Sequence, residues 1–234
     1  MLRATTHLGE AQNERFVAWV TQLQRHGLDV EIVQGEDARL DADIVFACGL
    51  LTALTIRTHG TREIIAAPIF AGEYEAVYRS VIVARIDSEL RSLRDRKGLR
   101  LSINEYASWS GWHGFNEHLR RIDAAPDTVA KHVLSGSHVA SLDAVLAGHA
   151  DIASIDHTIW KTQRRVDPRL SALRVIDTTH DWPAPPVSIR SSLLPEVQTQ
   201  IFDLLATMSD LVPVGGDRYS FMLAEIDHHP TKIP

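Results

Sequence analysis

The stretch AVYRSVIVARI, residues 76–86, divides the sequence into two halves of the same kind. It is rich in Val and Ile, which is typical of a strand, and it opens a second series of alternating strands and helices. The first series ends before residue 75, and the second occupies about residues 78–182. A last long helix is expected over residues 194–208, after a segment rich in proline.

Strand–helix alternation predicts the α/β class, with parallel strands covered by helices. The expected elements of the first series are strands at residues 2–8, 29–35, 42–49 and 63–70 and helices at 13–27 and 50–60. Those of the second series are strands at 76–86, 99–105, 131–136, 151–157 and 170–179 and helices at 88–98, 111–121, 138–150 and 158–165.

The order of these elements predicts two lobes. If the last helix packs on the first series, the chain crosses twice between the lobes, near residues 72–78 and 183–188. We therefore expect lobe 1 to contain residues 1–75 and 190–234, and lobe 2 to contain residues 78–185. Two lobes with two crossings leave a central cleft, which is the usual place for a ligand.

Charge and composition exclude several classes of protein. The chain has 234 residues and a formal net charge of -6, which argues against a surface that binds nucleic acid. Basic residues do cluster on the helix expected at 88–98 and just after it, where a solvated face is the simpler explanation: Arg91, Arg94, Arg96, Lys97 and Arg100. There is one cysteine, so no disulfide forms within the chain.

Membrane and export signals are not evident in the sequence. The N-terminal residues MLRATTHLGEAQNERF contain no apolar run of signal-peptide length. No stretch approaches the ~20 apolar residues of a membrane span, so no direct membrane insertion is expected. The sequence as it stands predicts a cytoplasmic protein. A periplasmic location is expected instead if it is a processed or trimmed form.

Four of the expected strands end in small or hydroxyl-bearing residues. These turns are Cys48-Gly49, Ser108-Trp109-Ser110-Gly111, Ser135-Gly136-Ser137-His138 and Asp156-His157. Ligands of open α/β sheets bind outside the carboxyl ends of strands. A helix N-terminus there offers unpaired N–H groups and partial positive charge, to which serine hydroxyls add donors. The same serines are also common helix caps, and both interpretations stay open.

A family resemblance rests on four segments: YRSVIV, SWSG, SGSHVASLDAVLAGHADIASID and LRVIDTTHDWPAPP. Together they resemble the phosphonate-binding proteins of ABC importers and their PhnD-like relatives, over about residues 75–190. In that family a Tyr-x-Ser strand precedes a Ser/Thr-rich turn that ends in Gly. Gly-Ser-His, a helix and the pattern G-x-A-D-x-A-x-x-D follow.

The resemblance implies a type II periplasmic-binding-protein fold with two α/β lobes, two crossing segments and a cleft. It also implies a small anionic ligand of the phosphonate, phosphate or phosphite type, and an ABC permease as partner. A binding protein of this kind has no catalytic residues and no cofactor.

By motif position, Ser108, Trp109, Ser110 and Gly111 form the anion-binding turn of the implied site. Ser137 and His138 supply further donors, Tyr78 lines the cleft, Asp156 faces a substituent such as an amine, and Gly49 belongs to the turn after the third strand. Trp109 stands where the family usually has a small hydroxyl residue. One side-chain donor is thereby lost, and the pocket shrinks or gains a stacking wall.

Other chemistries lack their motifs. There is no HExxH or paired-Cys zinc pattern, no G-x-S-x-G elbow and no P-loop. We therefore predict no metal and no enzymatic activity. The alternative is a cytoplasmic enzyme or a ligand sensor built on the same fold.

Overall fold

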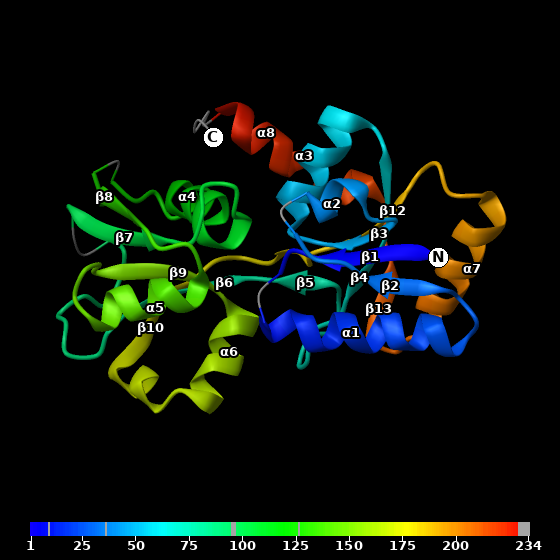
Figure 1. The fold of residues 1–234 in the computed structure, drawn as a ribbon. Helices are drawn as coiled ribbons and strands as arrows, with labels where there is room; N and C mark the ends of the chain where they lie inside the picture. Colours follow the sequence, from blue (N-terminus) through cyan, green and yellow to red (C-terminus); the bar gives the residue numbers. More distant parts are fainter. Residues whose placement is uncertain (9, 36, 95–96, 126, 229–234) are drawn as a thin grey trace. The chain divides into compact units, whose positions relative to one another are not determined.

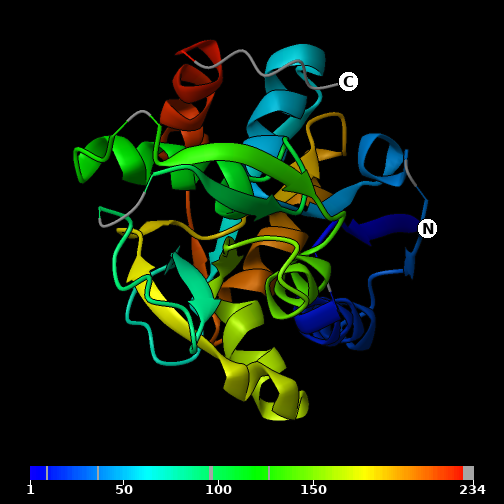
Figure 2. The same ribbon diagram turned by 90° about the vertical axis from the view of Figure 1, so that its left-hand side faces the viewer.

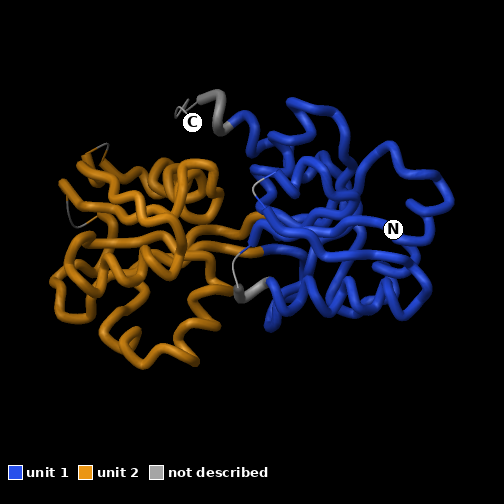
Figure 3. Tube along the Cα trace, in the orientation of Figure 1, with its two compact units in different colours: residues 1–77, 183–224 blue, residues 78–182, 225–234 orange. Residues whose placement is uncertain are grey.

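A computed structural model describes residues 1–8, 10–35, 37–94, 97–125 and 127–228, which form two compact units. The first unit consists of Met1–Val77 and Pro183–Ala224 (blue in Figure 3), and the second contains Tyr78–Trp182 (orange). The chain passes from one unit to the other at two places. There β5 (Val77–Tyr78) pairs with β11 (Trp182–Pro183) in a two-stranded sheet.

The first unit contains a six-stranded sheet with the order β13-β4-β12-β3-β1-β2. Its strands are β1 (Leu2–Thr6), β2 (Val30–Ile32), β3 (Ile44–Phe46), β4 (Arg62–Pro68), β12 (Val187–Arg190) and β13 (Leu211–Pro213). Its helices are α1 (Glu10–Arg25), α2 (Ala38–Asp41), α3 (Gly49–His59), α7 (Pro195–Ala206), η3 (Gly216–Tyr219) and α8 (Ser220–His228). Helices α1 and α3 lie on opposite sides of this sheet (Figure 1).

The helix α1 packs on the sheet through residues spaced by three and four positions. Phe16, Val20 and Leu23 are buried, and the Trp19 ring contacts Phe46 of β3 edge-on at 4.9 Å between centroids. Val17 does not belong to this buried face and is 42% exposed. Ile201 and Leu205 of α7 belong to the same hydrophobic cluster as these α1 residues.

The strand β12 lies between β3 and β4 and runs antiparallel to both. Arg62 of β4 holds it in place, because this buried guanidinium donates to the carbonyl of Ser188 at 3.1 Å and to its hydroxyl at 3.1 Å. The same side chain donates to the carbonyls of Ala42 at 2.7 Å and Asp43 at 3.2 Å. Burial, with the nearby positive charge of Arg190, lowers the pKa of Arg62 to about 10.

The second unit contains a five-stranded sheet with the order β10-β6-β9-β7-β8. Its strands are β6 (Ser80–Arg85), β7 (Leu99–Ile103), β8 (Val129–Leu134), β9 (Ile152–Asp156) and β10 (Leu173–Thr178). Its helices are the π-helical turn η1 (Trp109–His113), α4 (Gly114–Arg121), α5 (His138–Leu146), α6 (His157–Val166) and the short 3-10 helix η2 (Pro168–Ala172). Figure 1 shows α4 on one side of this sheet and α5 on the other, and Figure 2 shows β7 and β8 side by side.

Each sheet is mixed, whereas the sequence predicted parallel strands. β12 and β13 run antiparallel to the other strands of the first sheet, and β6 runs antiparallel to its neighbours β9 and β10 in the second. β6 directly follows the first crossing and β12 follows the second.

The helix expected over 88–98 is also wrong, since residues 88–94 form a loop and 95–96 lie outside the described residues. Arg174 of β10 donates to the carbonyls of Ile86, Ser88 and Leu90, so these carbonyls are taken by a side chain in place of helix amides. Leu90 and Leu93 are buried in the core. The basic residue Arg100 lies on β7, where it pairs with Asp151 at 2.7 Å.

The unit boundaries differ from those expected at 190 and 185. β12 begins at Val187 and is a strand of the first sheet. The first unit resumes at Pro183. The first unit ends at Ala224, and residues 229–234 of the expected lobe lie outside the described residues. None of the helices in the described ranges is both long and apolar enough to span a bilayer.

We expect the substitution Arg62→Leu to lower the free energy of unfolding by about 2–4 kcal/mol. It removes the donors that Arg62 gives to the carbonyls of Ala42, Asp43 and Ser188 and to the Ser188 hydroxyl in a buried setting. The Asp43 carbonyl keeps one donor, the N–H of Arg190 at 2.8 Å. Arg62→Lys should recover only part of this loss, because an ammonium group cannot match the planar fork. Denaturant unfolding measures the effect, with the exposed Arg25→Leu as control. Equal stability of the Arg62→Leu and Arg25→Leu variants would contradict this role.

Candidate functional site

The register of β6 and β9 places three buried polar side chains on one face of the second sheet. Ser80 lies opposite Asp156, and Ile82 lies opposite Ser154. Alternate residues of a strand share a face, so Ser80, Ser154 and Asp156 project from the same side. Ser80 and Ser154 are fully buried, and Asp156 is 9% exposed.

The turn SWSG lies against this face. Ser108 caps the π-helical turn η1, with its Oγ accepting the N–H of Gly111 at 3.0 Å. The carbonyl of Ser110 accepts two hydrogen bonds, from the hydroxyl of Ser80 at 2.9 Å and from that of Ser154 at 2.6 Å. Two strands therefore hold the peptide that follows Ser110.

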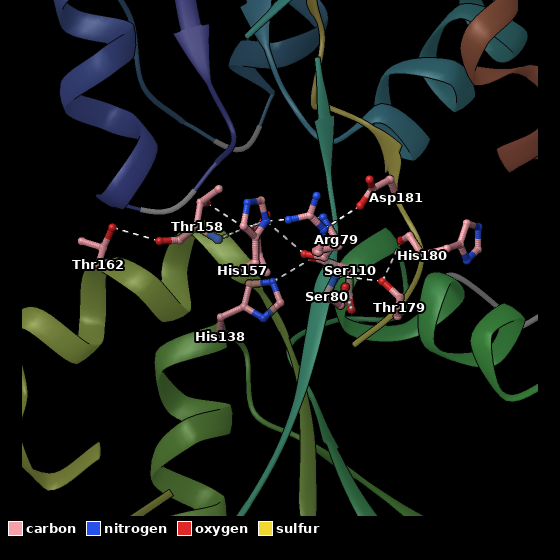
Figure 4. Close-up of polar contacts among 11 residues, drawn as sticks. Arg79, Ser80, Ser110, His138, His157, Thr158, Thr162, Thr179, His180 and Asp181 are labelled. Atoms are coloured by element: carbon pink, nitrogen blue, oxygen red, sulfur yellow. Dashed lines mark hydrogen bonds and ion pairs between the residues drawn. The ribbon is translucent and has the colours of Figure 1, made fainter. Parts of the chain in front are cut away.

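The side chain of Ser110 joins this turn to the second one. Its Oγ lies 3.0 Å from Nε2 of His138, the first residue of α5 (Figure 4). Ser137 caps α5, and its Oγ accepts the N–H of Ala140 at 3.0 Å. If Nε2 carries the proton, it donates to Ser110 and leaves the serine hydroxyl free to donate elsewhere. In the other tautomer Ser110 donates to Nε2.

Burial lowers the pKa of His138, and the negative charge of Asp156 and the backbone of Ser154 only partly oppose this shift. His138 is 9% exposed and sits beside a neutral hydroxyl. We therefore expect a neutral imidazole at pH 7.

Asp156 and His157 fix the start of α6 and the start of β6. Oδ1 of Asp156 accepts the backbone N–H and the hydroxyl of Thr158, both at 2.7 Å. The ring Nδ1 of His157 lies 3.2 Å from the carbonyl of Arg79, which also accepts the backbone N–H of His157 at 3.0 Å. On the other side, the N–H of Ser80 donates to the hydroxyl of Thr179 at 2.9 Å.

Trp109 is fully buried, so its ring is part of the interior of the second unit. It stacks on His113 with an interplanar angle of 17° and meets Trp182 edge-on at 5.0 Å. The ring packs beneath the turn and exposes no surface to solvent.

The two glycines of the expected site have steric reasons to be glycine. A Cβ on Gly111 would lie 1.8 Å from Oδ1 of Asn104, and one on Gly49 would lie 2.8 Å from the Tyr219 ring. Gly49 opens α3 in the first unit, whereas the other expected ligand-binding residues lie in the second. Tyr78 is the first residue of the second unit and is 2% exposed.

The structure shows that Ser108, Ser137 and Asp156 each cap a helix. It also brings the two serine-rich turns into contact through Ser110 and His138. A capping oxygen uses only its acceptor capacity, and the hydroxyl proton of Ser108 or Ser137 remains available for a ligand. Capping and anion binding are therefore compatible here.

Sequence reasoning missed Ser80, Ser154, Thr158 and Thr179. The first two stand inside the apolar runs RSVIVAR and DIASID, where a single hydroxyl interrupts a buried strand. A buried polar side chain needs a hydrogen-bond partner, so that interruption was the available signal.

A cavity of about 510 Å³ lies in the first unit between α1 and the end of α7. Its cation Arg15 is already paired with Asp210 at 3.3 Å and lies over the Phe70 ring at 5.2 Å. Within the described part of the chain, no three His, Cys, Asp or Glu side chains come together in a way that would hold a metal ion.

Residues 19–225 match the family described as "ABC transporter, phosphonate, periplasmic substrate-binding protein". The chain belongs to this family. The family resemblance inferred from the sequence is thereby confirmed, and the family consists of substrate-binding transport proteins and not of enzymes. Its members are periplasmic by that description.

Solved structures confirm the two-lobed fold. PhnD1 from Prochlorococcus marinus (MIT 9301), in complex with methylphosphonate, aligns with a TM-score of 0.83 at 16% identity over 97% of each chain. A binding protein component of an ABC phosphonate transporter from Pseudomonas aeruginosa gives 0.75 at 19% identity, over 96% of this chain and 84% of that one. XAC2383 from Xanthomonas citri, bound to ATP, gives 0.74 at 17% identity over 97% of both chains.

We expect Gly111→Ala to destabilise the protein by about 1–3 kcal/mol, because the new methyl group meets the Asn104 amide. The double variant with Asn104→Ala should recover part of the loss that is due to the clash. Thermal melts of both variants test this, with Gly216→Ala as control because a Cβ there meets nothing within 4 Å. A Gly111→Ala variant that melts like the wild type would disprove the close contact.

The lowered pKa of His138 predicts lower stability in acid. The unfolded chain takes up a proton near pH 6.5, whereas the folded protein does so only at lower pH. Stability from the neutral ring is therefore complete above about pH 6.5 and decreases as the pH falls toward the folded-state pKa. Unfolding measured from pH 7.5 to 5 should show a shallower decrease for His138→Gln than for the exposed His149→Gln. Equal slopes would contradict the prediction.

Proposed function

We propose that the protein binds a small phosphorus oxyanion, of the phosphonate, phosphate or phosphite type, through the two serine-rich turns of the second unit. The observation that carries the proposal is the 3.0 Å contact between Ser110 Oγ and His138 Nε2, which joins the turns. Ser108, Ser137 and one member of the Ser110–His138 pair then offer uncharged donors to the anion, because the contact within that pair uses one of its two protons.

The similar structures support this ligand class. PhnD1 is bound to methylphosphonate and XAC2383 to ATP, and both molecules carry phosphoryl oxygens. In the proposal, Tyr78 and the Trp109–Gly111 backbone of the second unit complete the ligand's surroundings. Oδ1 of Asp156 accepts two hydrogen bonds from Thr158. In the proposal, the other carboxylate oxygen faces a ligand substituent such as an amine.

The physiological role follows from the family. We infer that the ligand is delivered to an ABC permease and that the protein works in the periplasm, as the family description supports. Fractionation of cells that express the full gene product at its natural level tests the location. Recovery in the cytoplasmic fraction alone would contradict transport and favour a cytoplasmic ligand sensor.

We expect Ser108→Ala and Ser110→Ala each to weaken anion binding by about 10- to 150-fold, which corresponds to one hydrogen bond to a charged group. Ser137→Ala should behave in the same way. Calorimetry with methylphosphonate, phosphite and phosphate measures the affinity, and thermal melts accompany it. The matched control is Asp167→Ala, which removes a cap of η2 in the same unit.

Two outcomes would contradict the proposal, and they differ. If the serine variants melt at lower temperature but bind as tightly as the wild type, the serines act only as caps. If the wild type binds none of the three anions, the ligand class is wrong.

A further inference from the structure

The carbonyl of Ser110 accepts hydrogen bonds from side chains on two different strands. Ser80 on β6 and Ser154 on β9 both donate their hydroxyls to it, at 2.9 and 2.6 Å. Both serines are fully buried. One donor already satisfies a buried carbonyl, so the second is more than the fold requires.

We propose that Ser80 and Ser154 are positioning residues for anion binding, because their hydroxyls fix the Ser110–Gly111 peptide on which the binding turn is built. This inference rests on the proposed function. Neither serine touches the ligand in the proposal. They act through the turn that carries Ser108 and Ser110.

The first step of this action is geometric. The peptide held at its carbonyl by the two strands presents its N–H to Ser108 Oγ at 3.0 Å. That contact uses an acceptor lone pair of Ser108 and orients its hydroxyl proton away from the turn. The same peptide carries Ser110, whose Oγ is then held 3.0 Å from His138.

The second step is electronic. Hydrogen bonds in a chain polarise one another, and the effect is stronger in a buried, low-dielectric site. Two donors on the Ser110 carbonyl make the Gly111 N–H a better donor to Ser108. Ser108 in turn becomes a better donor to an anion.

The strands themselves hold the two hydroxyls in register. Ser80 and Ser154 share one face through the pairing of β6 with β9. The start of β6 is fixed by Thr179, which bonds the N–H of Ser80 at 2.9 Å and donates its own N–H to the carbonyl of Ser80 at 2.9 Å. The donors therefore belong to a rigid element, as precise positioning of a site requires.

The test compares Ser80→Ala and Ser154→Ala with Ser102→Ala. Ser102 is a matched control, because it is a fully buried serine of β7 in the same unit and its hydroxyl donates to the carbonyl of Val133 at 3.4 Å. Ser154→Cys keeps the volume of the side chain but is a weak donor, which separates packing from hydrogen bonding.

The first measurement is calorimetry with methylphosphonate. We expect Ser80→Ala, Ser154→Ala and Ser154→Cys each to weaken binding by about 3- to 10-fold, the equivalent of one neutral hydrogen bond. Ser102→Ala should bind like the wild type even if it melts at a similarly reduced temperature. Wild-type affinity in the Ser80 and Ser154 variants would overturn the proposal.

The second measurement needs no ligand. Triple-resonance NMR correlates the carbonyl carbon of Ser110 with the amide of Gly111 in one cross-peak. We expect the carbonyl resonance to move upfield and the amide proton to exchange faster in the Ser80 and Ser154 variants, and to stay unchanged in Ser102→Ala. An unmoved cross-peak overturns the positioning role. If the wild type binds no anion, the proposed function fails, and this cross-peak still decides the positioning role.

Discussion

The fold depends on the insertion of β12 between β3 and β4. In the order β13-β4-β12-β3-β1-β2, this strand joins β13 and β4 to β3, β1 and β2. It is supplied by residues 187–190, more than a hundred positions after β4 in the chain. The first unit therefore cannot be completed until the chain has passed through the second, and the long loop closure slows its formation. Arg62 stabilises the inserted strand, because its side chain bonds Ser188 of β12 and also the carbonyls of Ala42 and Asp43 just before β3.

The sheet of the second unit has no such dependence, because all five of its strands lie in the continuous segment Tyr78–Trp182. Its polar centre is the carbonyl of Ser110, on which two strands converge. A helix start supported in this way differs from an ordinary cap. Its donors are fixed by a sheet and not only by the local chain, so little conformational freedom is left to lose when an anion binds.

Much of this architecture was predictable from the sequence. Apolar runs such as DIVFAC and glycine-terminated helices gave most strands and helices, and the segment at 76–86 located the division of the chain. The family motifs identified the relevant turns. The strand β12 was missed because its four residues give little local signal. Its place in the sheet depends on a distant contact, the bond from Arg62 to Ser188. The false helix at 88–98 failed because Arg174, about eighty residues away, takes its carbonyls.

The candidate site shows the same limit. Ser108, Ser110 and His138 were predicted because each lies in a local sequence motif. Ser80 and Ser154 were not, because their importance depends on the pairing register of β6 and β9 and on a shared acceptor, neither of which is local in sequence.

Trp109 indicates how such a site tolerates change. It replaces a small hydroxyl residue in the family pattern, and its ring turns inward to pack on Trp182 and His113. A side-chain donor is lost, but the ring fills the space beneath the turn and adds aromatic contacts worth about 0.5–1.5 kcal/mol each. Fewer donors on a stiffer turn can still bind an anion well, since affinity depends on how little must be ordered as well as on the number of contacts. For the proposed anion site, the substitution therefore argues for a smaller set of donors held more firmly, among them the hydroxyls of Ser108 and Ser110.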